Sequence, residues 1–597
     1  MVEVKLLLLL GAHLLVTGLP GAAAALVAAR MGVSRVPVLL ATALAVSGAV
    51  AMLVFWMYFA APVAGEIFAW FTLLGSIEAV FLSLRGGGLD RMLLRQLATP
   101  LALWVLGSSF LVFLGFIHGG TSGPLLTAQY RFSGWALPSD NDIPRFYAGW
   151  FYAHGHSLRP PTYSTFLFSD RPPLQVGYVL MQAPFGSHAT ADLNYQLLGV
   201  ILQQLWIVGL WALLLAAKVG RTTRGLAVIT VLLSDLVIVN GFFVWPKLLA
   251  AAMLLAAAAL VATPLWTELR RSPWGAALVA ALLALAMLGH GSSIFGIVPL
   301  ALVAAVRGVP SWRWLAVGLA VGAAFLIPWS SYQKYVDPPG NRLTKEALAG
   351  VAAADSNSVL HDVIHAYRQA GLSGTVQNKE DNFETMVGVS GTSRDLIKGS
   401  VDALESGEMT SAVGDIRGLF FFFFLPSLGL LLIVPVLMAI GRRRRPAESP
   451  EWRLAMMSYA IVVVGCIVWG LAMFGNWTSS TVLHEGSYAL PVLAFCAAVA
   501  GVRAVFPRFA PWLVGANALL MLAIYSPSVL LPPAGPNTLR DIGYSTAYLP
   551  LATVLTAASL AGFAAVALIG DDKVRRRAPV PSASGHKRDR VGTTTGL

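Results

Sequence analysis

The chain has 597 residues, of which 57% are hydrophobic and only 12% are charged, and its mean hydropathy is +0.71. Soluble domains carry about 25% charged residues, so this composition excludes a soluble globular or a disordered protein. The formal net charge of +12 would suggest a nucleic-acid partner in a soluble protein. Here the basic residues gather in short segments between apolar runs, so we expect a lipid bilayer and no nucleic acid.

Apolar runs near twenty residues long recur from end to end and predict an all-α polytopic membrane protein with about 13–15 transmembrane helices. The first run lacks a basic leader and is followed at once by further runs, so we expect a retained helix rather than a cleaved signal. The candidate spans are 6–29, 36–60, 62–84, 97–117, 193–217, 225–243, 247–266, 274–290, 292–306, 313–332, 418–440, 453–474, 488–506, 510–530 and 549–570.

Basic residues concentrate in every second loop, including the arginine run 442–445 and the tail after residue 570. The positive-inside rule then predicts an outer N-terminus and a cytoplasmic C-terminus in the plasma (inner) membrane, with any active site on the extracytoplasmic face. We expect additional N-terminal transmembrane helices at 1–96 and a transmembrane core at 97–331, which contains a first outer loop at 118–192. A second outer loop, and possible lid, follows at 332–417. The chain then continues with C-terminal transmembrane helices at 418–570 and a disordered cytoplasmic tail at 571–597.

The first outer loop contains the sequence "SDNDIPRFYAGWFYAH". Its apolar residues recur at helical spacing from Ile143 to Phe151, which predicts a helix too short to cross a bilayer. We therefore expect this helix to lie along the membrane surface. Asp140 and Asp142 precede it, and each is a candidate catalytic base or a simple N-cap. Asp142 better suits the cap, which favours Asp140 as the base.

A second short segment, "DRPPLQVGYVLMQAPF", follows in the same loop. Two prolines force an extended entry after Asp170 and Arg171, and the apolar run 174–185 is again too short to span. We expect a second surface-lying or re-entrant helix that brings both charges to the headgroup level. Asp170 is a candidate substrate-binding residue, with a simple ion pair to Arg171 as the alternative.

An acidic motif in the first large outer loop, followed by short juxtamembrane helices and an "RPPL" element, resembles the GT-C superfamily of integral-membrane glycosyltransferases. The resemblance covers about a quarter of the chain and implies transfer of a sugar from a polyprenyl-phosphate carrier to a glycan, glycolipid or protein acceptor on the outer face. It also implies a loop carboxylate that acts as base or, in some branches, holds a divalent metal ion. Four spans precede the loop here instead of one, so the first three would be an addition.

Other polar residues stand at the predicted outer ends of spans. Arg171 and Lys247 are the best candidates for binding a donor phosphate, followed by His290, Arg145 and His484. Trp245, His484, Glu485 and Tyr488 are further candidate substrate-binding residues. Lys247 and Trp245 also suit simple anchoring at the bilayer interface, and His484 with Glu485 also suits a solvated loop pair. His154 and His156 alone are too few for a metal site.

These features favour an inverting glycosyltransferase with a polyprenyl-phosphate-linked sugar as donor. The alternatives are a transporter or flippase of a lipid-linked glycan and a polysaccharide polymerase or ligase. Transporters place binding groups near the middle of the bilayer, often on interrupted helices. Only Asp235 is expected at that depth, and most candidate residues stand at outer span ends, which favours an enzyme.

Overall fold

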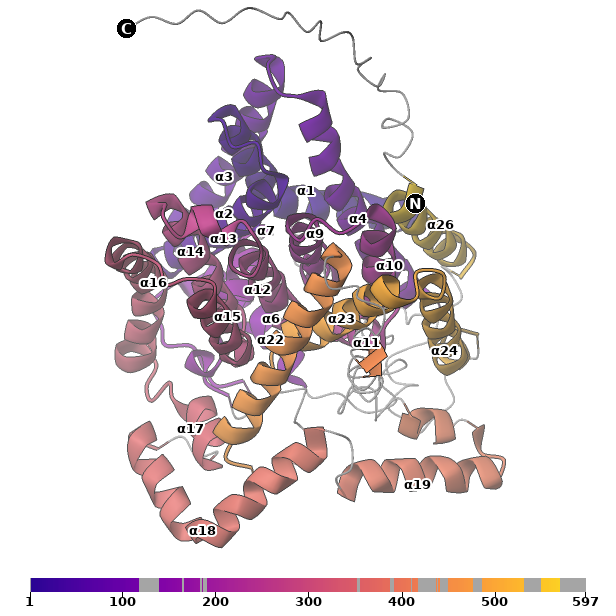
Figure 1. Ribbon diagram of the computed structural model, residues 1–597. Helices are drawn as coiled ribbons and strands as arrows, with labels where there is room; N and C mark the ends of the chain where they lie inside the picture. Colours follow the sequence, from indigo (N-terminus) through magenta and orange to yellow (C-terminus); the bar gives the residue numbers. More distant parts are fainter. Residues whose placement is uncertain are drawn as a thin grey trace, which may run out of the picture.

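The computed structural model describes residues 2–117, 139–163, 166–182, 185, 191–351, 355–386, 391–409, 411–416, 436–437, 439–440, 449–475, 486–530 and 549–569. These residues form helices joined by turns (Figure 1). Eight of the helices are long and apolar enough to cross a membrane, so the chain is a multi-pass helical membrane protein. They are Val4–Arg30 in α1 (Val2–Arg30), Val36–Ala60 (α2), Pro62–Arg85 (α3), Arg91–Phe116 (α4), Asp192–Ala216 in α8 (Ala191–Gln203) and α9 (Trp206–Ala216), Trp312–Val336 in α16 (Trp312–Ser331) and η6 (Tyr332–Val336), Pro450–Ala472 (α22) and Pro550–Ile569 in α26 (Leu549–Ile569).

Several predicted spans have a different form in the structure. The span predicted at 225–243 is broken into α10 (Arg221–Leu232) and α11 (Asp235–Phe243), which are bent by 54°. The predicted span 418–440 falls largely outside the described residues. Four other predicted spans are apolar helices of 17 residues or fewer: α12 (Lys247–Val261), α14 (Pro273–Gly289), η5 with α15 (Gly291–Val306) and α23 (Ala489–Val505). The span predicted at 510–530 corresponds to α24 (Ala510–Leu530).

The helix predicted after the acidic motif is present as α6 (Ile143–His154), preceded by the 3-10 turn η1 (Ser139–Asp142). It ends at Gly155, whose φ of 55° is a conformation that glycine adopts without strain. The apolar face of α6 packs inside the protein and not on a membrane surface, because Tyr147 and Phe151 are fully buried. The ring of Phe151 lies 4.8 Å from that of Phe168.

The second predicted short helix is α7 (Leu174–Gln182), and it too is enclosed by protein. It packs against α2 and α6. Gly177 makes this contact possible, since a Cβ atom at that position would lie 2.2 Å from the carbonyl oxygen of Ala51 on α2. The 3-10 turn η2 (Phe168–Asp170), which ends with Asp170 and is followed by Arg171, leads into α7.

The second outer loop supplies α17 (Arg342–Ala349), α18 (Val359–Met386) and α19 (Gly391–Glu405), which lie at one end of the helix bundle (Figure 1). The segment between α16 and α17 packs onto the first outer loop. Asp337, fully buried, accepts hydrogen bonds from Arg159 at 2.9 Å and from the backbone N–H of Ser169 at 2.9 Å. The two loops are therefore joined at the residues that precede α7 and α17.

Candidate functional site

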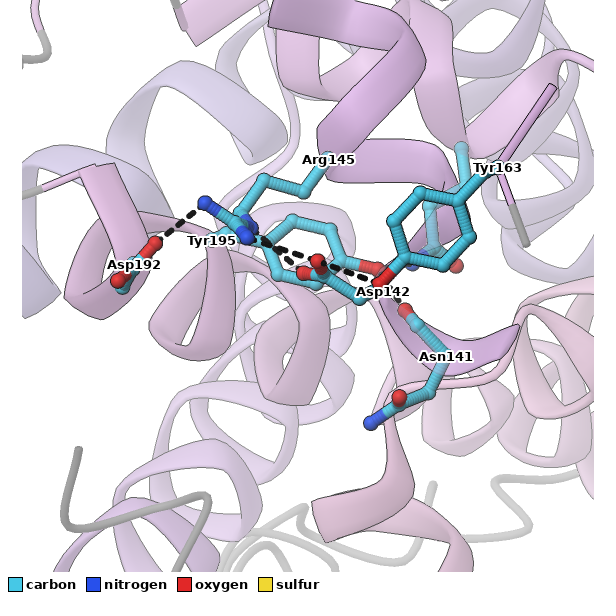
Figure 2. A network of polar contacts seen from close by, with 7 residues as sticks. Asn141, Asp142, Arg145, Tyr163, Asp192 and Tyr195 are labelled. Carbon is cyan, nitrogen blue, oxygen red and sulfur yellow. Dashed lines mark hydrogen bonds and ion pairs between the residues drawn. The ribbon is translucent and has the colours of Figure 1, made fainter. Parts of the chain in front are cut away.

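The acidic motif forms a compact ion-pair network at the start of α6 (Figure 2). The guanidinium of Arg145 binds both carboxylate oxygens of Asp142, through Nε at 2.5 Å and Nη2 at 2.7 Å. Its Nη1 donates to Asp192 at 2.5 Å, and the hydroxyl of Tyr163 donates to Asp142 at 3.2 Å. Hydrogen bonds from Arg145 to Asp142 raise the pKa of the guanidinium above its usual value. The network is therefore charged and links the first outer loop to α8.

This geometry changes the predicted roles of two residues. Asp142 occupies the N-cap position of α6, but its side chain makes no capping hydrogen bond because it pairs with Arg145. A carboxylate bound by a bidentate guanidinium has both oxygens already engaged as hydrogen-bond acceptors. Arg145, predicted to bind the donor phosphate, is already shared by two carboxylates. The side chain of Asp140, the other candidate base, lies outside the described residues.

A chain of buried hydrogen bonds connects the acidic motif to α11. The carbonyl of Asn141 accepts from the hydroxyl of Tyr195 at 2.5 Å, and that hydroxyl accepts from Nε2 of Gln175 at 3.2 Å. The same amide donates to the carbonyl of Val244 at 2.9 Å. Gln175 of α7 therefore lies between the aspartate motif and the turn that follows α11.

That turn holds its residues in a constrained backbone. Val244 has φ 52°, a left-handed conformation that costs a β-branched residue roughly 1–2 kcal/mol. Gly199 provides the space for it, because a Cβ atom there would lie 2.5 Å from Cβ of Val244. Backbone strain of this kind persists where the surrounding structure enforces it, which is typical of functional sites.

Lys247 is the first residue of α12, and a buried glutamine fixes that helix end. Oε1 of Gln203 accepts hydrogen bonds from the backbone N–H groups of Leu248 at 3.1 Å and Leu249 at 3.2 Å. The first turn of a helix has N–H groups without intrahelical acceptors, so a side chain must supply them. Nε2 of Gln203 donates to Gln175 at 3.4 Å, which joins this helix end to the hydrogen-bond chain.

Two cations predicted to bind a phosphate converge on one indole ring. Nζ of Lys247 lies 4.0 Å from the ring centre of Trp245, and the guanidinium carbon of Arg171 lies 5.7 Å from it. Lys247 is 2% exposed and Trp245 8% exposed. The indole of Trp245 is therefore enclosed by protein and contacts two cations, and its role in substrate binding stays a prediction.

His290 and Tyr488 complete this cation cluster. The imidazole of His290 lies 5.6 Å from the ring of Trp245, and the ring of Tyr488 lies 5.1 Å from Nζ of Lys247. Burial, and then the charges of Lys247 and Arg171, hold the pKa of His290 well below its usual value. Its Nδ1 accepts from the backbone N–H of Ser292 at 3.2 Å, so the neutral ring carries its proton on Nε2 and is a donor there.

Asp170 lies beside the cation cluster with its side chain fully buried. One oxygen, Oδ2, accepts from the backbone N–H of Leu167 at 2.9 Å and lies 3.9 Å from Nη1 of Arg342. The other, Oδ1, has no hydrogen-bond partner among the described residues. Burial raises the pKa of Asp170, although the Leu167 N–H and the charges of Arg342 and Arg171 oppose this shift.

The contribution of α17 to this cluster could not be predicted from the sequence. Arg342 lies with its guanidinium carbon 5.2 Å from the ring centre of Phe166, and Arg171 contacts the same ring at 4.6 Å. Burial raises the pKa of Glu346, one turn along α17, against the charges of Arg342 and Arg171. No local pattern distinguishes these residues from other charges of the second outer loop. Gln175 and Gln203 did leave a signal, as polar residues inside apolar runs.

Two predicted substrate-binding residues, His484 and Glu485, lie outside the described residues. His154 and His156 both lie in the described part of the chain. The ring of His154 lies 4.3 Å from that of Trp150 at an interplanar angle of 50°, and Nδ1 of His156 contacts the carbonyl of Phe59 at 3.1 Å. Among the described residues, no group of three or more histidine, cysteine or acidic side chains could hold a metal ion.

Comparisons with protein-family models, with curated proteins and with solved structures give no match for this chain.

Proposed function

We propose that the protein is a glycosyltransferase that moves a sugar from a polyprenyl-phosphate donor to a cell-envelope glycan, glycolipid or protein on the outer face of the membrane. The observation that carries the proposal is the approach of Arg171 and Lys247 to one buried indole, that of Trp245. Convergent lysine and arginine side chains are a usual means of binding a phosphate group in proteins. A lipid phosphate is an anion that reaches such a site from the bilayer.

The proposed sugar transfer requires a carboxylate base and cations that stabilise the leaving phosphate. An acceptor hydroxyl attacks the anomeric carbon, the bond from that carbon to the phosphate oxygen breaks, and the hydroxyl proton passes to a carboxylate base. The polyprenyl phosphate leaves with the negative charge, which Arg171 and Lys247 would stabilise and which the Nε2–H of His290 would share. We assign the base to Asp140, because Asp142 is bound by Arg145.

A transfer assay with matched variants tests the proposal. Purified protein in lipid nanodiscs is incubated with polyprenyl-monophosphate sugars and candidate acceptors, and released polyprenyl phosphate is measured. We expect Lys247→Gln to lower turnover by at least about tenfold, the cost of one hydrogen bond to a charged group. Lys334→Gln is the control, because Lys334 also lies over an aromatic ring, at 5.1 Å from Tyr335, but is exposed.

Asp140→Asn and Asp142→Asn separate the two candidate bases. We expect loss of a general base to cost about 10²–10⁴ in turnover for Asp140→Asn and less for Asp142→Asn. If no sugar donor is consumed under any condition by the wild-type protein, or if Lys247→Gln behaves like Lys334→Gln, the transferase proposal is wrong.

One observation favours a second candidate, a transporter of a lipid-linked glycan. Asp235 begins α11 at the 54° break with α10, it is 1% exposed, and neither of its side-chain oxygens has a hydrogen-bond partner among the described residues. Interrupted helices with a buried acid are typical of transporter sites. Movement of a fluorescent lipid-linked glycan across liposomes without donor turnover, abolished by Asp235→Asn, would favour this candidate over the enzyme.

A further inference from the structure

The backbone of Ser169, the residue before Asp170, is held at both of its polar groups by side chains of the second outer loop. Its N–H donates to Oδ2 of Asp337 at 2.9 Å, and its carbonyl oxygen accepts from Nε2 of Gln333 at 2.9 Å. These hydrogen bonds join positions 168 and 164 residues apart in the chain. One segment of the second outer loop therefore fixes the backbone of η2.

Asp337 is itself held firmly. Its Oδ1 accepts from Nε of Arg159 at 3.1 Å and from Nη2 at 2.9 Å, and its backbone N–H donates to the carbonyl of Tyr332 at 3.0 Å. The side chain of Asp337 is 1% exposed, whereas that of Arg159 is 56% exposed. A buried carboxylate with charge-assisted hydrogen bonds has a fixed position. Asp337 is thus a rigid acceptor for the N–H of Ser169.

Gln333 is placed by the turn that precedes α17. Its Nε2 donates to the carbonyl of Gly340 at 2.9 Å as well as to that of Ser169. Gly340 has φ 63°, and a Cβ atom at this position would lie 2.5 Å from Cβ of Gln333. The turn therefore requires glycine here, and it brings residue 340 back onto η6. The amide of Gln333 joins this turn to η2.

Aromatic contacts add to these hydrogen bonds between η6 and η2. The ring of Tyr332 stacks on that of Trp329, with 5.2 Å between the ring centres and an interplanar angle of 5°. The same ring lies 5.4 Å from that of Phe168, the first residue of η2. Both Tyr332 and Phe168 are buried. The segment 332–340 and η2 therefore share one packed interface.

The charged residues that follow Ser169 belong to the candidate site. Asp170 ends η2, and the guanidinium carbon of the next residue, Arg171, lies 5.7 Å from the ring centre of Trp245. The backbone at Ser169 sets the position from which both side chains leave the chain. A shift of this backbone would therefore move Asp170 and Arg171 together, and small displacements of binding groups have large effects on a site.

We propose that Asp337 and Gln333 are positioning residues of the donor site, which hold Ser169 and so direct Asp170 and Arg171 towards the bound lipid phosphate. This inference rests on the proposed function. The second outer loop takes part in donor binding through the backbone of η2, and neither positioning residue has to contact the phosphate itself.

Binding of polyprenyl monophosphate to the full-length protein in nanodiscs tests this role. Asp337→Ala removes the acceptor of the Ser169 N–H. The matched control is Asn382→Ala, because Asn382 is a buried residue of the same loop that donates to the carbonyls of Gly470 at 3.1 Å and Met473 at 2.9 Å, at the end of α22. Both variants should lose stability, and only Asp337→Ala should weaken binding, by at least about tenfold. Gln333→Met should weaken binding in the same direction.

A double-mutant cycle shows whether Asp337 acts through Arg171. In the Arg171→Gln protein, Asp337→Ala should have little further effect on affinity, because the group that it positions is already absent. In the Lys247→Gln protein, Asp337→Ala should weaken binding by the same factor as in the wild-type protein. A merely structural role would weaken binding equally in both backgrounds.

Hydrogen exchange without ligand gives a measurement that does not depend on the proposed function. Asp337→Ala should speed the exchange of the amides of Ser169, Asp170 and Arg171, and Asn382→Ala should leave their exchange unchanged. Unchanged exchange in Asp337→Ala would mean that other contacts hold η2, and the inference would be refuted.

The binding outcomes separate this inference from the proposed function. If Asp337→Ala binds the lipid phosphate like Asn382→Ala while Lys247→Gln loses it, the positioning role is refuted and the donor site stands. If Asp337→Ala weakens binding as expected but the wild-type protein never transfers a sugar, the inference holds and the transferase proposal fails. If the wild-type protein binds no lipid phosphate, both fail.

Discussion

Gln203→Met removes the side-chain hydrogen-bond acceptor for the first turn of α12, the helix that begins with Lys247. Methionine is close to glutamine in length, so the volume of this fully buried position is kept while two backbone N–H groups, of Leu248 and Leu249, lose their acceptor. Each buried donor left unsatisfied costs about 1–3 kcal/mol, which gives about 2–6 kcal/mol in total. Hydrogen bonds inside membrane proteins are worth less on average, so the lower end, about 2 kcal/mol, is expected.

The assay combines stability with ligand affinity. The free energy of unfolding is measured by denaturant titration in mixed micelles, and polyprenyl-monophosphate affinity is measured in nanodiscs. Gln182→Met is the matched control, because Gln182 is 4% exposed and its amide contacts Thr17 and His13, away from the cation cluster. Both variants should lose stability, and only Gln203→Met should also lose affinity, because it frees the turn that carries Lys247.

Two results would refute this reasoning. Equal losses of affinity in both variants would mean that general destabilisation, and not the position of Lys247, controls binding. An unchanged affinity in Gln203→Met would mean that the end of α12 is held by other contacts, and that Gln203 has no positioning role.

Three further predictions follow from single contacts. Gly177→Ala should destabilise the protein by about 1–3 kcal/mol, measured by the same denaturant titration, because its Cβ atom would approach the carbonyl oxygen of Ala51 to 2.2 Å. The pKa of Asp170 is raised in the folded protein, so above the ordinary aspartate pKa of about 4 the folded state binds more protons than the unfolded state. The free energy of unfolding should therefore fall as the pH rises from about 4 to the raised pKa. Denaturant titrations at several pH values should show that Asp170→Asn lacks this part of the pH dependence. A double-mutant cycle with Asp142→Asn and Arg145→Gln should give a coupling energy of about 1 kcal/mol, since the pair is bidentate but partly exposed, and a value near zero would contradict its structural role.

Much of the helical framework could be predicted from the sequence, because apolar length and helical periodicity depend on nearby residues. The first three spans and the helix after Asp142 match the structure within a few residues. The break before Asp235 could not be predicted, because hydropathy does not respond to a bend. The aromatic stripe of α6 packs against protein and not, as expected, along a membrane surface, because such a stripe packs equally well against lipid and against protein.

The residues of the candidate site could also be predicted only in part. Arg171, Lys247, Trp245, His290 and Tyr488 could be selected from the sequence, because each stands at the end of an apolar segment. Their convergence on one indole depends on contacts between elements far apart in the chain, and sequence patterns do not contain that information. Arg145 was assigned to the phosphate for its charge alone, and the structure gives it two carboxylate partners instead.

The positions of the charged residues on their helices also bear on the choice between sugar transfer and lipid transport. Lys247 begins α12, Arg342 begins α17 and Arg171 precedes α7, so all three cations stand at helix ends. A transport path through the break between α10 and α11 would take a lipid phosphate from these cations past the buried Asp235, whose side chain has no hydrogen-bond partner among the described residues. When ionised, that carboxylate repels a phosphate, and the low dielectric of the interior strengthens the repulsion. A reaction completed at the helix ends avoids this barrier, which is why we rank transfer above transport.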